Sequence, residues 1–202
     1  MKIALIGATG NVGSAILDEL VRRGHDVTAI VRRPEKVPVL KGVTAQKGDV
    51  FDQNDLASLL KGHDVAISSV HFTASDPDGL VASVKASGVK RYLVVGGAGS
   101  LETAPGVTLV SSPEFPAEYK AEATKGGEFL ELLRRQDNVN WTFLSPSALF
   151  FDGPRTGQFR LGKDQLLTNG KGSSISFADY AIALVDELER PVHIRQRFTV
   201  GY

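Results

Sequence analysis

The stretch that decides the fold is KIALIGATGNVGSAI, residues 2–16. A mostly apolar run is followed at once by Gly7, Gly10 and Gly13, and then by a helical pattern of apolar residues. Glycine permits the tight turn that joins a strand to a helix, and it lets the backbone approach a ligand closely. The spacing G-x-x-G-x-x-G in this context indicates a site for the pyrophosphate of a dinucleotide, and a tight turn without a ligand is the simpler alternative.

The next 130 residues alternate short apolar runs with helical patterns. Strands are predicted at 26–31, 43–47, 64–70, 91–97 and 140–146, and helices at 11–23, 53–62, 76–88 and 113–136. Apolar strands that alternate with helices indicate a parallel sheet covered on both faces. Right-handed crossovers then give an α/β fold with a doubly wound parallel sheet.

The last third of the chain, residues 147–202, has a different pattern. Glycine-rich loops and short strands are predicted around 156–162 and 164–169, followed by a helix over 176–189 and a final strand over 197–202. No linker separates this part from the rest, so we expect one domain over residues 1–202. Residues 147–202 would form a small C-terminal elaboration on the substrate side.

The composition is that of an ordinary globular domain. The chain has 202 residues, no cysteine, and 23 basic and 23 acidic side chains that cancel. We therefore expect no disulfide, no thiolate metal site and no basic surface for nucleic acid. No apolar run approaches the ~18 residues of a membrane span. A cytoplasmic protein is the expectation.

The end of the second predicted strand indicates which dinucleotide is bound. Sites that prefer NAD usually place Asp or Glu there to bind the ribose 2′-hydroxyl. This chain has Arg32 and Arg33 instead, and Arg32 lies 19 residues after Gly13, since 32 − 13 = 19. Two guanidinium groups suit a 2′-phosphate, which predicts NADP(H) over NAD(H). A solvated surface pair is the alternative.

Small and acidic residues end the next two strands. Asp49 follows the third strand and could bind the adenine amino group, with Val50 beside the ring, although a turn or capping role fits Asp49 nearly as well. Ser68 and Ser69 end the fourth strand. Their small side chains would leave room for the cofactor to cross the strand tips where the sheet order switches.

Together these segments resemble the atypical short-chain dehydrogenase/reductases. The resemblance rests on GATGNVG, VRRP, GDVFD, YLVVGGAGSL, NWTFLSPSALF and ISFADYAIALVDELERP, and covers nearly the whole chain. The nearest group is the small NAD(P)H-binding proteins described as NADH-flavin reductases, with biliverdin-reductase-B-like and NmrA-like proteins more distant. The resemblance implies a Rossmann-type fold. It also implies cofactor contacts at Gly7, Thr9, Gly10, Asn11, Val12, Gly13, Arg32, Asp49 and Val50, with nicotinamide near Ser68, Ser69, Val70, Gly97, Pro146 and Ser147.

The catalytic pair of ordinary short-chain dehydrogenases is absent. Those enzymes protonate a carbonyl oxygen with a tyrosine that is assisted by a lysine four residues later. The residues four after Tyr92, Tyr119 and Tyr180 are Gly, Ala and Leu, and the chain ends at Tyr202. A flavin or quinone-like acceptor can take a hydride while stacked on nicotinamide and receive its proton from solvent. The missing pair therefore counts against alcohol or sugar dehydrogenation.

Four residues remain as candidates for the substrate pocket. His71 and Phe72 follow the fourth strand, where Phe72 could stack on a substrate, and an ordinary loop role is equally compatible. Ser111 lies in a long segment that could cover the pocket, and Tyr119 follows it. The other three histidines are scattered without metal-ligand spacing, so no metal is expected.

Two classes of function follow from these patterns. The favoured one is an NAD(P)H-dependent reductase that transfers hydride to a flat, conjugated small-molecule acceptor such as free flavin. The alternative is a non-enzymatic, NmrA-like redox sensor that binds NADP(H) and controls a protein partner. An isomerase or epimerase with tightly held cofactor is a third reading, which the missing Tyr/Lys pair disfavours.

Overall fold

The strand before the glycine turn lies near the centre of an eight-stranded sheet. The computed structural model describes residues 1–202. The sheet order is β3-β2-β1-β4-β5-β8-β12-β10. These strands are β1 Lys2–Ile6, β2 Asp26–Val31, β3 Val43–Lys47, β4 Val65–Ser68, β5 Arg91–Val95, β8 Asn140–Ser145, β10 Arg160–Gly162 and β12 Gln196–Gly201. All neighbours pair in parallel except β10, which is antiparallel to β12. The predicted doubly wound α/β fold is confirmed.

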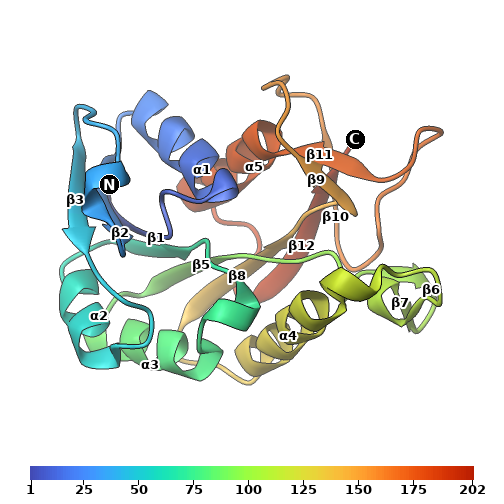
Figure 1. Ribbon diagram of the computed structural model, residues 1–202, viewed down its shortest axis with the longest axis horizontal. Coiled ribbons are helices and arrows are strands. Elements are labelled where there is room, and N and C mark those ends of the chain that lie inside the picture. Colours follow the sequence, from blue (N-terminus) through green and yellow to red (C-terminus); the bar gives the residue numbers. More distant parts are fainter.

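Five helices cover the two faces of this sheet (Figure 1). Helices α1 (Asn11–Arg22) and α5 (Phe177–Glu189) lie together on one face. Helices α2 (Gln53–Leu60), α3 (Pro77–Ser87) and α4 (Ala117–Arg134) cover the other. Each layer closes over its own hydrophobic core, of 23 and 19 buried residues. The central strands β1, β4, β5 and β8 are buried from both sides, which is why they read as mostly apolar runs rather than alternating ones.

Polar groups inside the sheet are paired within the core. The Tyr92 hydroxyl and the Ser68 hydroxyl are 2.8 Å apart, and both side chains are buried. The Tyr180 hydroxyl donates to the carbonyl oxygen of Leu144 at 2.7 Å. Buried hydroxyls without such partners would cost free energy, so these bonds fix how α5 and the strands sit together.

The C-terminal segment extends the main sheet and adds small pieces at its edge. Strands β12 and β10 continue the sheet beyond β8, and β9 (Leu149–Phe151) pairs in parallel with β11 (Ser174–Ser176). A separate small hairpin, formed by β6 (Glu102–Ala104) and β7 (Val107–Thr108), lies earlier in the chain, between β5 and α4. None of the helices is both long and apolar enough to cross a lipid bilayer.

Two expectations from the sequence need correction. The strand expected at 164–169 is absent, because that segment makes only isolated bridges, one of them between Gln165 and Glu102. The helix expected from residue 113 begins at Ala117 instead. Pro113 and Pro116 lack the backbone N–H of other residues and disfavour helix in the residue before them, so the chain turns helical only after Pro116.

Candidate functional site

The glycine turn divides into two packing positions and one open position. Gly7 has φ +84°, and a Cβ there would collide with the carbonyl oxygen of Ser69. A Cβ at Gly13 would collide with the carbonyl oxygen of Gly7. At Gly10 the nearest atom to an added Cβ is the Gly7 oxygen, at an ordinary 3.5 Å. Gly7 and Gly13 are therefore needed for the fold, whereas the protein itself leaves the space at Gly10 free.

Helix α1 begins at this turn without any capping group. Gly10 is its N-cap residue, no side chain accepts a hydrogen bond there, and the first turn has no acidic residue. Helices α2 and α5 are capped by Asp52 and Ser176 respectively. The first N–H groups of α1 and the positive end of its dipole are thus available to an anion.

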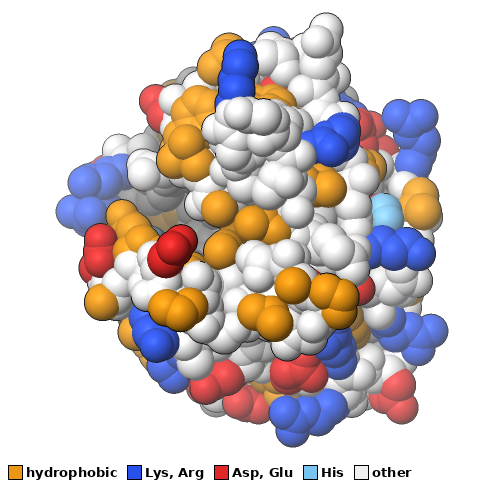
Figure 2. Space-filling view, turned by 90° about the vertical axis from the view of Figure 1, so that its right-hand side faces the viewer, with side chains coloured by type: hydrophobic (Ala, Val, Ile, Leu, Met, Phe, Trp, Pro, Cys, Tyr) orange, Lys and Arg blue, Asp and Glu red, His pale blue; other side chains and the backbone are white.

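A cleft of about 560 Å³ opens at this turn. It lies at the carboxyl ends of β1 to β5, where the strand order switches direction between β1 and β4. Figure 2 looks onto the side of the molecule where β5 and β8 end, and the surface there is hollowed, with hydrophobic side chains around the hollow. Ligands of open α/β sheets bind at this topological position.

One end of the cleft is lined from β2 and β3. Arg32 and Arg33 are exposed, and neither guanidinium takes part in an ion pair or a side-chain hydrogen bond of this chain. Asp49 accepts a hydrogen bond from the Phe51 N–H at 3.0 Å, so it has the turn role that was the alternative at this position, and it also lines the cleft beside Val50. The Phe51 side chain is 62% exposed there.

The other end is lined from β4, β5 and α4. The Glu122 carboxylate accepts hydrogen bonds from the Phe72 N–H at 2.7 Å, the Thr73 N–H at 2.9 Å and the Thr73 hydroxyl at 2.7 Å. Its Oε1 lies 3.3 Å from Nδ1 of His71. Burial on its own raises the pKa of Glu122, but the hydrogen bonds from Thr73 and Phe72 outweigh it and lower the pKa below its ordinary value. The carboxylate is therefore held in its charged form.

Phe72 has the structural role that was the equal alternative at this position. Its side chain is only 6% exposed and packs against Phe143 and Phe129, with ring centroids 6.3 and 6.1 Å away. A Cβ at Gly126 of α4 would come within 2.8 Å of the ring. The buried Phe72 ring thereby fixes the short 3₁₀ turn η2 (Phe72–Ala74) to the core. His71, the residue before it, lies at the surface of the cleft.

The residues predicted to contact the cofactor or the substrate mostly line the cleft. Seven of them do not. The lining includes Gly7, Thr9, Gly10, Asn11, Val12, Arg32, Arg33, Asp49, Val50, Ser69, Val70, His71 and Phe72. Outside it are Gly13, Ser68, Gly97, Pro146, Ser147, Ser111 and Tyr119.

For five of these seven residues the structure gives a physical reason. Ser68 and Ser147 are buried, and their hydroxyls are engaged with Tyr92 and with the carbonyl oxygen of Val200. Ser111 donates to the carbonyl oxygen of Thr108 in its own turn. Tyr119 points to solvent, 61% exposed. Gly13 packs against Gly7 beneath the cleft.

No tyrosine is available to the cleft. Burial raises the pKa of Tyr92 and of Tyr180, and both are bonded inside the core. The Tyr202 hydroxyl donates to the Asp179 carboxylate at 2.8 Å, and burial together with this carboxylate raises its pKa. The structure thus extends the sequence argument, because Tyr92, Tyr180 and Tyr202 are engaged within the protein, and Tyr119 faces solvent outside the lining of the cleft.

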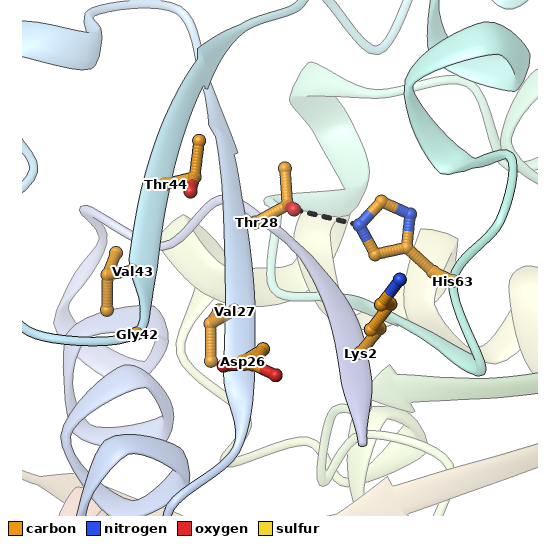
Figure 3. A pocket seen from close by; sticks show the side chains of 8 residues that line it. All are labelled: Lys2, Asp26, Val27, Thr28, Gly42, Val43, Thr44 and His63. Atoms are coloured by element: carbon orange, nitrogen blue, oxygen red, sulfur yellow. Dashed lines mark hydrogen bonds between the residues drawn. The ribbon is translucent and has the colours of Figure 1, made fainter.

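A second hollow of about 340 Å³ lies at the amino ends of β1, β2 and β3 (Figure 3). It is mostly polar and includes Lys2, Asp26 and His63, whose Nε2 lies 2.8 Å from the Thr28 hydroxyl. None of its lining residues belongs to a helix, and its one glycine, Gly42, directly precedes β3. No group of three or more His, Asp or Glu side chains is placed to hold a metal ion.

Two cleft residues that sequence reasoning missed are Glu122 and Phe177. Glu122 is 50 residues from the Phe72 N–H that it binds, and only the docking of α4 on η2 brings them together. Phe177 is the first residue of α5, where its ring packs on Phe150 at 4.8 Å. The only sequence signal for Phe177 was its place at the start of a predicted helix.

Comparisons with known proteins agree with this geometry. The sequence model of a family described as NAD(P)H-binding matches residues 7–191. The chain belongs to this NAD(P)H-binding family. The predicted resemblance and the prediction of a dinucleotide site are thereby confirmed at the level of the family.

Three similar proteins cover nearly the whole chain. YwnB of Bacillus subtilis is 45% identical over 99% of this chain and 98% of its own. A protein of Bacteroides thetaiotaomicron named "putative epimerase" is 42% identical with TM-score 0.95, over 100% of this chain and 96% of that one. A protein of Streptococcus pneumoniae named "putative NADH-flavin reductase" is 42% identical with TM-score 0.82, over 100% and 99%.

Proposed function

We propose that this protein is an NADP(H)-dependent reductase that transfers hydride to a flat, conjugated acceptor such as free flavin. The observation that carries the proposal is a dinucleotide cleft whose lining contains neither a tyrosine nor a lysine. The cleft therefore lacks the tyrosine acid and its lysine with which ordinary short-chain dehydrogenases protonate a carbonyl oxygen. Reduction of a flat conjugated acceptor needs mainly that two rings are held face to face and water is excluded.

The residues of the cleft fit the dinucleotide. The open position at Gly10 leaves space that a Cβ would fill, and the uncapped start of α1 suits the pyrophosphate. Arg32 and Arg33 would bind the 2′-phosphate, because both are exposed in the cleft and neither guanidinium has a partner within the chain. Asp49, Val50 and the exposed Phe51 would surround the adenine.

The nicotinamide would lie on the opposite side of the switch point, beside Ser69, Val70 and Gly96. When bound in reduced form, it supplies a hydride. The chain holds the floor of this region rigid: β4 and β5 form it, and η2 is fastened to α4 through Glu122. Phe177 offers an aromatic edge from α5 on which an acceptor ring could pack.

A sensor of the NADP(H) redox state remains the second candidate, because a cleft without a tyrosine acid suits binding without turnover equally well. The name of the Streptococcus pneumoniae protein favours reduction, and the name of the Bacteroides thetaiotaomicron protein favours isomerisation. Net oxidation of NADPH in the presence of an acceptor distinguishes reduction from both.

The test is steady-state turnover of saturating NADPH with a panel of flavins, quinones and biliverdin-like acceptors. The proposal predicts turnover with at least one of these acceptors. Tyr119→Phe serves as the control variant and should change kcat by far less than the 10²–10⁴-fold of an obligatory acid, because Tyr119 faces solvent outside the cleft. NADPH binding without turnover for every acceptor would contradict the proposal and favour the sensor.

A further inference from the structure

His71 is the one imidazole in the lining of the cleft. The other ionisable groups in the lining are Arg32, Arg33, Asp49 and Glu122. A guanidinium offers only donors and a carboxylate offers only acceptors, whereas an imidazole has one nitrogen for each role and is the side chain that most often serves as a general acid or base. The histidine is 84% exposed, so water can reprotonate it after each cycle.

The position of His71 suits the reacting end of the dinucleotide. It follows β4, while Arg32 and Arg33 follow β2, and the two strands lie on opposite sides of β1. Adenosine and nicotinamide occupy opposite sides of this switch point. The imidazole therefore lies on the nicotinamide side, at the mouth of the cleft.

The ring contacts one carboxylate, and the backbone that carries it is held separately. Its Nδ1 lies 3.3 Å from Oε1 of Glu122, a carboxylate already fixed by the N–H groups of Phe72 and Thr73. The next residue, Phe72, is buried in the core. The Ser75 hydroxyl donates a hydrogen bond to the carbonyl oxygen of His71 at 2.8 Å. A carboxylate on Nδ1 keeps the proton on that nitrogen and turns Nε2 away from Glu122.

We propose that His71 donates the proton that completes reduction of the acceptor, and that Glu122 is the residue that positions its ring. The inference rests on the proposed reductase function. A hydride adds to the acceptor and leaves one of its oxygen or nitrogen atoms anionic, while the dinucleotide is left oxidised. The N–H bond at Nε2 of the imidazolium then breaks, an O–H or N–H bond forms on the acceptor, and the neutral imidazole takes a proton from water.

The test compares His71→Ala with the wild-type protein, using NADPH and a naphthoquinone as the probe. We expect kcat to fall about 10²-fold, with the dissociation constant for NADPH nearly unchanged. Added imidazole should restore much of the lost rate, because it can enter the space left by the ring. His63→Ala is the matched control: His63 lies in the other hollow (Figure 3), and its loss should leave kcat and the imidazole response unaltered.

Glu122→Gln tests the positioning role with a readout that does not depend on turnover. The ¹⁵N spectrum of the His71 ring should report one tautomer in the wild-type protein and a mixture in the variant. In the same variant kcat should fall, with little change in KM for the quinone. A merely structural contact would not change the tautomer.

The outcomes separate the two proposals. If the wild-type protein reduces the quinone and His71→Ala does so at the same rate, the role of His71 is overturned and the reductase function stands. If His71→Ala is slow but imidazole restores nothing, the ring acts as a contact only, and the role is again overturned. If the wild-type protein binds NADPH and reduces no acceptor, both proposals fall.

Discussion

The three glycines of the opening turn show how residues of one type serve different needs. Gly7 and Gly13 are required by the protein, because a Cβ at either would strike backbone oxygen. Gly10 is not, because a Cβ there meets only an ordinary contact at 3.5 Å, and its φ of −76° suits any residue. The fold does not require glycine at this uncapped helix start. A ligand that occupies the space would explain why the residue is glycine.

Gly10→Val should therefore separate binding from folding. We expect a folded protein with an unfolding midpoint close to that of the wild type, because a Cβ at this position comes no closer than 3.5 Å to another protein atom. Its affinity for NADPH should fall strongly, since the isopropyl group would occupy the space of the pyrophosphate. Titration calorimetry measures the affinity. Unchanged affinity would show that the dinucleotide does not lie on this turn.

Arg32→Ala tests the choice between the two dinucleotides. A charge-assisted hydrogen bond contributes ~1.5–3 kcal/mol, which corresponds to about one to two decades in affinity. NADPH binding should weaken by this amount, while NADH, which lacks the 2′-phosphate, should bind nearly as before. Equal losses for both dinucleotides, or a wild-type preference for NADH, would contradict the assignment.

At the scale of elements, the contact between α4 and η2 shapes the acceptor end of the cleft. Gly126 lets the helix lie directly on the Phe72 ring, and Glu122, one turn earlier, fastens the backbone of η2. Gly127, the next residue, faces open space, where an added Cβ would meet only Ser100 at 3.7 Å. The two adjacent glycines of this helix thus have opposite environments.

Alanine at each position should change stability in opposite directions. Gly126→Ala should destabilise the protein by ~1–3 kcal/mol, because the Phe72 ring is held by Phe129 and Phe143 and cannot move aside. Gly127→Ala should stabilise it by about 0.5–1 kcal/mol through helix propensity. Urea unfolding of both variants measures this difference, and equal effects would contradict the described packing.

The elements that sequence predicted are those set by local pattern. Buried strands such as β1 and β5 are recognisable as apolar runs. The first glycines predict the turn between strand and helix, and they predict a dinucleotide as its ligand. Glu122 could not be found this way, because its role depends on a helix docking 50 residues from its partner. The packing of Phe72 could not be predicted for the same reason, because nothing in its sequence neighbours indicates that Gly126 and Phe143 enclose the ring.

At the scale of the whole molecule, a buried carboxylate joins distant segments. Glu19 of α1 is 3% exposed and pairs with Arg23 at 2.8 Å and with Arg155 at 2.8 Å. Arg23 in turn pairs with Asp186 and Glu189 of α5. The cluster thereby ties together α1, α5 and the loop that carries Arg155.

This cluster predicts how stability depends on acid. The hydrogen bond from Arg155, opposed by burial and supported by Arg23, lowers the pKa of Glu19 in the folded protein. A lowered folded-state pKa contributes stability above the unfolded value, and that contribution is lost as pH falls below about 4.5 through the folded pKa. Glu19→Gln should lower the free energy of unfolding at pH 7 and flatten its fall toward acid, as measured by urea unfolding across pH. An equally steep fall in the variant would contradict this role.

The account as a whole depends on the cleft holding a reduced dinucleotide and passing its hydride to a flat acceptor. The most direct measurement is a single turnover, in which the protein loaded with NADPH is mixed with a flavin or quinone and oxidation is followed by absorbance. We predict oxidation far faster than in free solution, slowed by deuterium at nicotinamide C4 and abolished in Gly10→Val at the same NADPH concentration. Oxidation no faster than without protein, with NADPH demonstrably bound, would contradict the account.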